Sequence, residues 1–354
     1  MTLAELPSLP GILSAEDIRR SGEAIARVQT PDGSIPWFPD GHTDAWDHVE
    51  NAMALLVSGE RLAAERAYDW LARTQRDDGS WAMKVVGGSV ADAGTDANMV
   101  AYVAVGVWHH WLVTADEQFL SRSWPVVERA LNRVVSMQLP FGGVAWAAGA
   151  DGLVAESALV TSSSSIYHAL LCGIALADLL DRSRPAWVSA AGRLAHALRF
   201  HEDRFDPRGR YSMDWYYPVL GGAVRGNDAA SRIQSRWDEF VVPDLGVRCV
   251  SDRPWVTGAE TCELALSLHA IGDDRGATDL VAQMQHLRDP DGSYWTGYVF
   301  TDGLRWPVEC STWTASAVVL AVDAISETTG GANVFRGDRL PAVPEEHGEC
   351  GCAA

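Results

Sequence analysis

Two kinds of helical segment alternate along the chain. Segments of the first kind have apolar residues on one face and charged residues on the other, and those of the second kind are apolar on nearly all sides. A helix of the first kind covers a core from outside, whereas a helix that is apolar on every side must be buried. The first kind is predicted at residues 14–28, 60–75, 117–137, 185–203, 228–240 and 273–286, and the second at 44–58, 95–112, 160–181, 214–224, 258–271 and 309–328.

This alternation predicts an all-α fold, in which six outer helices surround six inner helices as an (α/α)6 barrel, or toroid, of six helical hairpins. We assign residues 14–329 to this barrel, residues 1–13 to an N-terminal extension and residues 330–354 to a C-terminal tail or surface strap. The inner helices of such a ring are parallel. Side chains near their first residues are therefore expected to share one opening.

A turn motif recurs after the amphipathic helices. Each turn combines an Asp-Gly or Gly-Gly step, which supplies a positive φ angle, with a Trp that can pack on the neighbouring repeat. The Trp residues that end the turns are Trp37, Trp81, Trp146, Trp215, Trp255 and Trp295, at separations of 44, 65, 69, 40 and 40 residues. The clear copies begin at Gln29, Gln75, Gln138 and Gln285.

The composition narrows the class of protein. A net charge of −19 makes nucleic acid a poor partner, because binding to phosphates needs clustered Lys and Arg. The first residues have neither a basic nor an apolar signal-peptide region, and runs such as Val100–Val107 and Ala315–Val322 are too short for a transmembrane segment. We therefore expect a cytoplasmic protein whose six Cys, including the Cys350/Cys352 tail, are free thiols.

The Gln-x-x-x-Asp-Gly-Ser-x-Trp turns resemble the QW-type repeats of the terpene cyclase and protein prenyltransferase toroids. The segments Gly258-Ala-Glu-Thr-Cys-Glu-Leu-Ala-Leu and Glu309-Cys-Ser-Thr-Trp-Thr-Ala-Ser-Ala are similar to the openings of their inner helices. The resemblance implies an enzyme that acts on an isoprenoid. The DxDD motif is missing, with Asp44-Ala-Trp-Asp47 and Thr95-Asp96-Ala-Asn98 the nearest segments. Glu309 stands where a zinc-binding His would be wanted, so we expect neither a metal nor another cofactor.

Carboxyl groups lie near the start of every predicted inner helix. The first explanation is structural, because acidic residues cap helix N-termini and interact favourably with the helix dipole, and Asp44 and Thr95 occupy such positions. The second explanation is catalytic. Asp47 and Glu50 are three residues apart on one helix face, where two close carboxyls would split their pKa values and keep one protonated. The candidate catalytic residues are Asp47, Glu50, Asp96, Asp214 and Glu309.

Aromatic residues are concentrated in the same segments. Their number exceeds what turn packing requires, although some of them can equally be core residues. Together with nearby polar groups they form the expected substrate-binding set: Trp46, His48, Asn51, Trp146, Glu156, Trp215, Tyr216, Tyr217, Glu260, Trp306 and Trp313.

Two chemistries use carboxyl groups among aromatic faces. In carbocation chemistry a carboxylic acid donates a proton and π-faces stabilise the cation, whereas in glycoside hydrolysis two carboxyls act together and aromatic rings stack on sugars. The resemblance makes a terpene cyclase or prenyltransferase-like enzyme with a small-molecule substrate the first choice. A carbohydrate-active enzyme of the glycoside hydrolase type, with a sugar substrate, is the alternative. A non-catalytic binding toroid is the third possibility.

Overall fold

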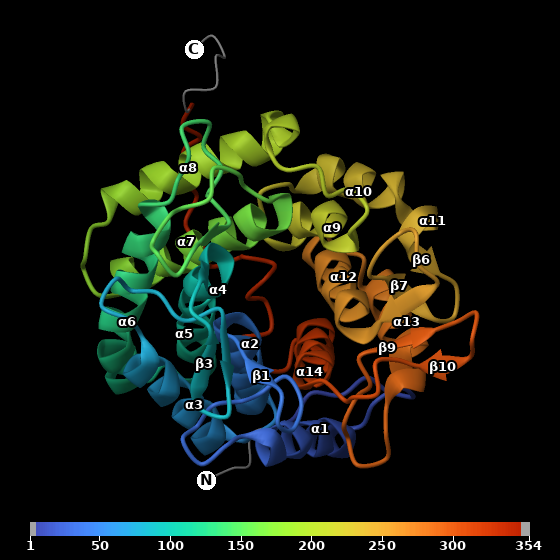
Figure 1. Cartoon of the computed structure of the whole chain (residues 1–354). Helices are drawn as coiled ribbons and strands as arrows, with labels where there is room; N and C mark the ends of the chain where they lie inside the picture. The colour runs from blue at the N-terminus through green and yellow to red at the C-terminus, as the bar shows by residue number, and fades with distance from the viewer. Residues whose placement is uncertain (1–4, 348–354) are drawn as a thin grey trace.

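The structure, a computed structural model, describes residues 5–347 and forms a closed ring of helices around a central axis (Figure 1). The outer layer contains α1 (Ala15–Val28), α3 (Arg61–Thr74), α6 (Glu117–Val135), α8 (Pro185–Phe200), α10 (Gly226–Ser235) with α11 (Trp237–Phe240), and α13 (Asp274–Gln283). The inner layer contains α2 (Ala45–Val57), α4 (Ala97–Ala101) with α5 (Val103–Thr114), α7 (Val160–Leu179), α9 (Ser212–Leu220), α12 (Gly258–Ala270) and α14 (Thr312–Ser326). The predicted (α/α)6 toroid is confirmed.

Each inner helix packs against the next one around the ring, in the order α2, α5, α7, α9, α12, α14 and back to α2. The outer helices α3, α6, α8, α10 and α13 lie against the inner helices that precede them in the chain. The ring closes where the sixth turn meets α1. Arg288 is paired with Asp17, and a Cβ atom on Gly292 would come within 2.5 Å of the Arg20 backbone.

The geometry that recurs in the turns explains how adjacent repeats are joined. The side-chain amide of Gln75 donates hydrogen bonds to the carbonyl of Gly79 in its own turn and to the carbonyl of Val126 in the next outer helix, at 2.9 Å each. Its oxygen accepts from Arg129 of that same helix. Gln29 and Gln138 make the same three kinds of bond. The turn motif therefore holds the repeats together, which is a structural function.

Short strands occur in the connections at the end where the inner helices begin, which we call the mouth. They were not predicted, because two to four residues are too few for a periodic pattern. The three sheets are β1 (His42–Thr43), β2 (Lys84–Val86) and β3 (Ser89–Asp92); β4 (Thr95–Asp96) and β5 (Ala147–Ala148); and, in the order β10-β9-β8-β7-β6, β6 (Val241–Val242), β7 (Gly246–Arg248), β8 (Trp255–Thr257), β9 (Gly297–Val299) and β10 (Leu304–Arg305).

The opposite end of the ring is closed by the chain after α14. The expected surface strap is partly buried, because Val334 and Phe335 are 3% and 6% exposed. The Phe335 ring stacks on His168 of α7 at 5.4 Å, and its carbonyl accepts a hydrogen bond from Arg225 at 2.8 Å. The strap therefore covers the end of the ring that lies opposite to the mouth.

The inner helix α7 is long and apolar enough to span a membrane by composition, but 94% of its apolar window is buried inside the protein. It is the central helix of the third hairpin, so burial in the ring accounts for its composition. Cys172, Cys249, Cys262 and Cys310 are free thiols in the described part of the chain, while the Cys350/Cys352 tail lies outside the described residues.

Candidate active site

The inner helices α2 and α12 carry four carboxyl groups at equivalent positions. Asp47 and Glu260 are each the third residue of their helix, and Glu50 and Glu263 are each the sixth. A rise of about 1.5 Å per residue puts the second pair roughly 4.5 Å deeper in the ring. Both helices pack against α14, so they flank the same inner helix.

The carboxyls nearest the mouth each have a buried free oxygen. Asp47 and Glu260 are 4% and 3% exposed, and Asp47 Oδ1 and Glu260 Oε2 have no hydrogen-bond partner within residues 5–347. Burial raises the pKa of Asp47 well above its usual value, and the negative charges of Asp44, Glu50 and Glu263 raise it further. Burial also raises the pKa of Glu260. A buried polar atom without a partner is costly, which suggests that a ligand completes these contacts.

The deeper carboxyls form part of a small cavity on the axis. Glu263 accepts hydrogen bonds from the hydroxyls of Tyr216 and Tyr217, at 2.5 and 2.7 Å. Glu50 and Glu263 line a cavity of about 10 Å³, whose floor includes Phe335 of the strap. This is about the space that one water molecule needs. Burial raises the pKa of Glu263 well above its usual value, with a further contribution from the charge of Glu50.

The protonation of Glu50 makes the stability of the protein depend on pH. Burial raises its pKa from 4.5 to about 8, so between these values the folded state holds a proton that the unfolded state releases. The stabilising effect is complete below pH 4.5 and is lost as the pH rises through 8. We expect the free energy of unfolding of the wild type to fall relative to that of Glu50→Gln by a few kcal/mol, as an order of magnitude, between pH 5 and 9.

Urea denaturation at intervals across this pH range measures the effect. The exposed Glu117→Gln variant on α6 is the matched control and should run parallel to the wild type. Equal slopes for the wild type and Glu50→Gln would show that Glu50 is ionised in the folded protein.

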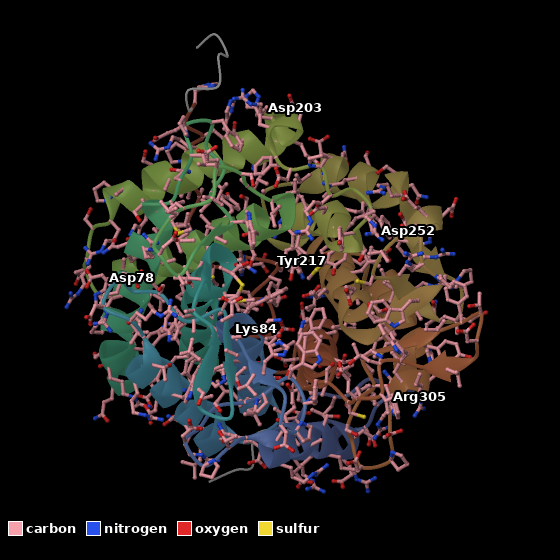
Figure 2. The ribbon with its side chains drawn as sticks, viewed as in Figure 1. Asp78, Lys84, Asp203, Tyr217, Asp252 and Arg305 are labelled. Carbon is pink, nitrogen blue, oxygen red and sulfur yellow. The ribbon has the colours of Figure 1, made fainter. Side chains whose placement is uncertain are left out.

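Aromatic rings lie around the axis at the level of these carboxyls. The half-buried Trp46 lies 5.9 Å from Tyr102, 6.2 Å from Tyr217 and 6.0 Å from Trp313, as measured between ring centroids. Trp46, Tyr217 and Trp313 lie on α2, α9 and α14, and Tyr102 lies between α4 and α5. Figure 2 shows Tyr217, together with Lys84 of β2, over the middle of the ring. The site is therefore an acidic centre with aromatic walls.

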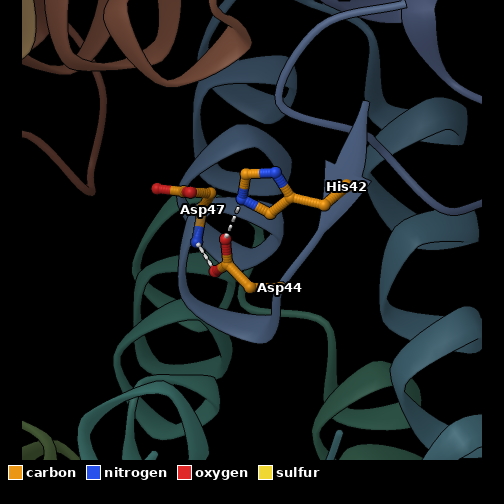
Figure 3. Close-up of side chains that lie close together, drawn as sticks. All are labelled: His42, Asp44 and Asp47. Carbon is orange, nitrogen blue, oxygen red and sulfur yellow. Dashed lines mark hydrogen bonds and ion pairs between the residues drawn. The ribbon is translucent and has the colours of Figure 1, made fainter. Parts of the chain in front are cut away.

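Three side chains beside this centre could hold a cation. His42, Asp44 and Asp47 each offer one ligand atom, and these atoms lie within 4.8 Å of one another. Figure 3 shows the imidazole of His42 facing the Asp44 carboxylate, at 3.7 Å, while Asp44 also accepts a hydrogen bond from the backbone nitrogen of Asp47. Burial lowers the pKa of His42, which favours the neutral imidazole that binds metals. The zinc set considered from the sequence does not include His42 or Asp44.

Several predicted site residues have structural contacts away from the axis. Asp96, and not Thr95, caps α4 through the backbone nitrogens of Asn98 and Met99. The remaining contacts join elements of the ring. Asp214 accepts hydrogen bonds from Thr161 of α7, and the Trp215 ring stacks on Phe240 at 5.3 Å. His48 is hydrogen-bonded to the backbone of Ile35 and Ala67, and Asn51 is hydrogen-bonded to the side chains of Thr312 and Ser316 of α14. Asp96 differs from the others, because burial and the nearby charge of Asp44 raise its pKa to about 6.

The other predicted residues lie on the connections around the mouth. Glu309 accepts hydrogen bonds from the indole of Trp37 at 2.9 Å and from Thr296 at 3.2 Å. Glu156 is exposed, Trp146 is half-buried, and Trp306 is 52% exposed. The structure adds Glu263, Tyr102 and His42 to the predicted set. The position of Glu263, three residues after Glu260, matched that of Glu50 after Asp47 and could have indicated it.

Comparisons with known proteins narrow the class. No protein-family profile matches the chain. The fold is shared with a wild-type glycosidase, at a TM-score of 0.70 and 15% sequence identity; the match covers 89% of this chain and 97% of that one. It is also shared with a D-mannose isomerase, at a TM-score of 0.67 and 13% sequence identity, over 89% of this chain and 99% of that one. The MMP endo-(1,4)-3-O-methyl-alpha-D-mannosidase of Mycolicibacterium hassiacum is 54% identical over 351 residues, which are 99% of this chain and 98% of that protein.

The identity to this relative supports an enzyme of the glycosidase type, and the fold that carries it is an (α/α)6 toroid. The chain belongs to the family of the Mycolicibacterium hassiacum endo-mannosidase. The prediction of a terpene cyclase or prenyltransferase-like enzyme, with an isoprenoid substrate, was therefore wrong, and the glycoside hydrolase alternative is the better supported one. The resemblance misled because it rested largely on turns whose Gln and Gly residues join neighbouring repeats of the ring.

Proposed function

We propose that the chain is a glycoside hydrolase that cleaves internal 1,4-linkages of a 3-O-methylated α-mannan. The activity for which the relative is named, together with 54% identity across nearly the full length of both proteins, supports this substrate class. The observation that carries the proposal in the structure is the pair Asp47 and Glu260, which have buried, unpartnered oxygens at equivalent positions on α2 and α12. Glycoside hydrolysis requires two such carboxyls.

The two carboxyls have different surroundings, which suggests their roles. Asp47 lies among three other carboxyls that keep it protonated, so it is the proton donor to the leaving oxygen. The pKa of Glu260 is raised by burial and not by neighbouring carboxyls, and the nearby Thr257 and Cys249 side chains favour its ionised form. Glu260 is then the carboxylate that acts on water or on the anomeric carbon.

The aromatic walls suit this substrate. Trp46, Tyr217 and Trp313 offer ring faces to the apolar faces of sugars, and Trp46 and Trp313 each have a buried indole N–H without a partner in the described chain. A sugar hydroxyl or ring oxygen can accept a hydrogen bond from either indole. This contact would orient the unit that undergoes cleavage.

Incubation with a 3-O-methylated α-1,4-mannan tests the proposal. Because an enzyme that cleaves internal linkages cuts the polymer between its ends, we expect oligosaccharides of intermediate size as the first products, followed over time by mass spectrometry. An unmethylated α-1,4-mannan and an α-1,4-glucan are the control polymers. Release of monosaccharide from the start, or no cleavage of the methylated polymer, would contradict the proposal.

A further inference from the structure

The sheet at the sixth turn has an apolar face that is open to solvent. Trp255 pairs with Val299, and Val299 pairs with Leu304, so these residues share one face. Trp306 follows Leu304 by two residues and extends the same face. Leu304 is 63% exposed and Trp306 is 52% exposed. An apolar cluster of this kind on the surface indicates a binding site.

The two indoles of this face are held in place by the strands. The Trp255 indole donates a hydrogen bond to the carbonyl of Trp306 at 3.0 Å, and the two rings are 5.2 Å apart at an angle of 76°. A Cβ atom on Gly297 would come 2.4 Å from Trp255 Nε1, so the indole lies closely over this glycine. The opposite face is already used, because Tyr298 packs on His286 and Arg305 is paired with Asp289.

This face is continuous with the candidate active site. Strand β8 ends at Thr257, the N-cap of α12, and Glu260 lies in the first turn of that helix. The backbone of Trp306 is bonded to Gly297, which pairs with Thr257. Figure 1 shows β9 and β10 on the rim of the ring, outside α12 and α14, and Figure 2 places Arg305 there. Trp255 of this face is therefore only five residues from Glu260 along the chain.

We propose that the face formed by Trp255, Val299, Leu304 and Trp306 binds an O-methylated sugar unit of the polymer, away from the bond that is cleaved. The proposal rests on the proposed function. A methyl ether replaces a hydroxyl donor by an apolar group, so a methylated unit needs apolar contacts in place of hydrogen bonds. One methyl group that is fully removed from water contributes about a fourfold gain in affinity.

The test compares Trp306→Ala and Leu304→Ser with the wild type on methylated and unmethylated α-1,4-mannans. Leu62→Ser is the matched control, because Leu62 is 76% exposed and follows the loop between α2 and α3 at the far end of the ring. Steady-state kinetics give KM and kcat, light scattering gives the oligomeric state, and thermal denaturation reports folding.

We expect KM for the methylated polymer to rise about tenfold in Trp306→Ala and about fourfold in Leu304→Ser. The value of kcat should be unchanged, and KM for the unmethylated polymer should rise less than KM for the methylated one. Leu62→Ser should behave like the wild type. The assignment would be overturned if KM were unchanged in both variants, or if KM rose equally for both polymers. It would also be overturned if the oligomeric state changed and KM did not. Failure of the proposed function would appear separately, as a wild type that does not cleave the methylated polymer.

Discussion

Asp47→Asn and Glu260→Gln should each reduce the rate of glycoside hydrolysis by about a thousandfold. An amide has nearly the same shape as a carboxyl group but neither donates an acidic proton nor acts as a base, and general acid–base catalysis contributes between about a hundredfold and ten-thousandfold. Both residues have a buried oxygen that makes no hydrogen bond to any of the described residues, 5–347. Their substitution should therefore leave the thermal unfolding temperature unchanged or raise it. Reducing-sugar release from a methylated mannan, beside a melting curve, measures both effects.

The deeper carboxyls provide the comparison for this prediction. Glu50→Gln and Glu263→Gln should reduce activity less, because these groups lie one turn further from the mouth and Glu263 is held by two tyrosines. Asp116→Asn, at the N-cap of α6, is the matched control and should retain full activity, because Asn also caps helices. If Glu263→Gln were inactive while Glu260→Gln remained active, the assignment of Glu260 would be wrong and Glu263 would be the partner of Asp47.

Gly79→Ala should lower the free energy of unfolding by about 3 kcal/mol. Gly79 has a φ of +89°, and a Cβ atom there would come 2.3 Å from the carbonyl oxygen of Arg129, which belongs to the next outer helix. The neighbour is backbone, so relief requires the two repeats to move apart. The same contact recurs at Gly33 with Arg66 and at Gly142 with Arg193, each at 2.5 Å. Denaturation in guanidinium chloride measures the loss.

Gly272→Ala separates the two causes of this loss. Gly272 has nearly the same φ, +86°, but no atom lies within 4 Å of its ideal Cβ in the described structure. Its substitution should therefore cost only the conformational strain, about 1 kcal/mol. Equal losses at the two positions would show that the contact between the repeats contributes nothing.

The correction of the predicted activity follows from these turns. Gln75 and Gly79 recur because the turns at Gln29, Gln75 and Gln138 join adjacent repeats in the same way, whatever reaction the ring supports. A repeated motif of this kind identifies the architecture, which enzymes of different chemistry share. Residues that carry out catalysis occur once each, so the repeat did not point to them.

The order and approximate bounds of the twelve predicted helices came from the sequence alone, because apolar spacing is a local property and each hairpin repeats it. The acidic residues near the first residues of α2 and α12 could likewise be identified from the sequence. Only the tertiary structure decided which acids face the axis, since a helix that is apolar on every side has no pattern to show its orientation. Trp215 and Tyr217 illustrate this, because they are two residues apart on α9 and yet one stacks on Phe240 while the other reaches Glu263. Asp47 and Glu260 are brought to the same level only by closure of the ring.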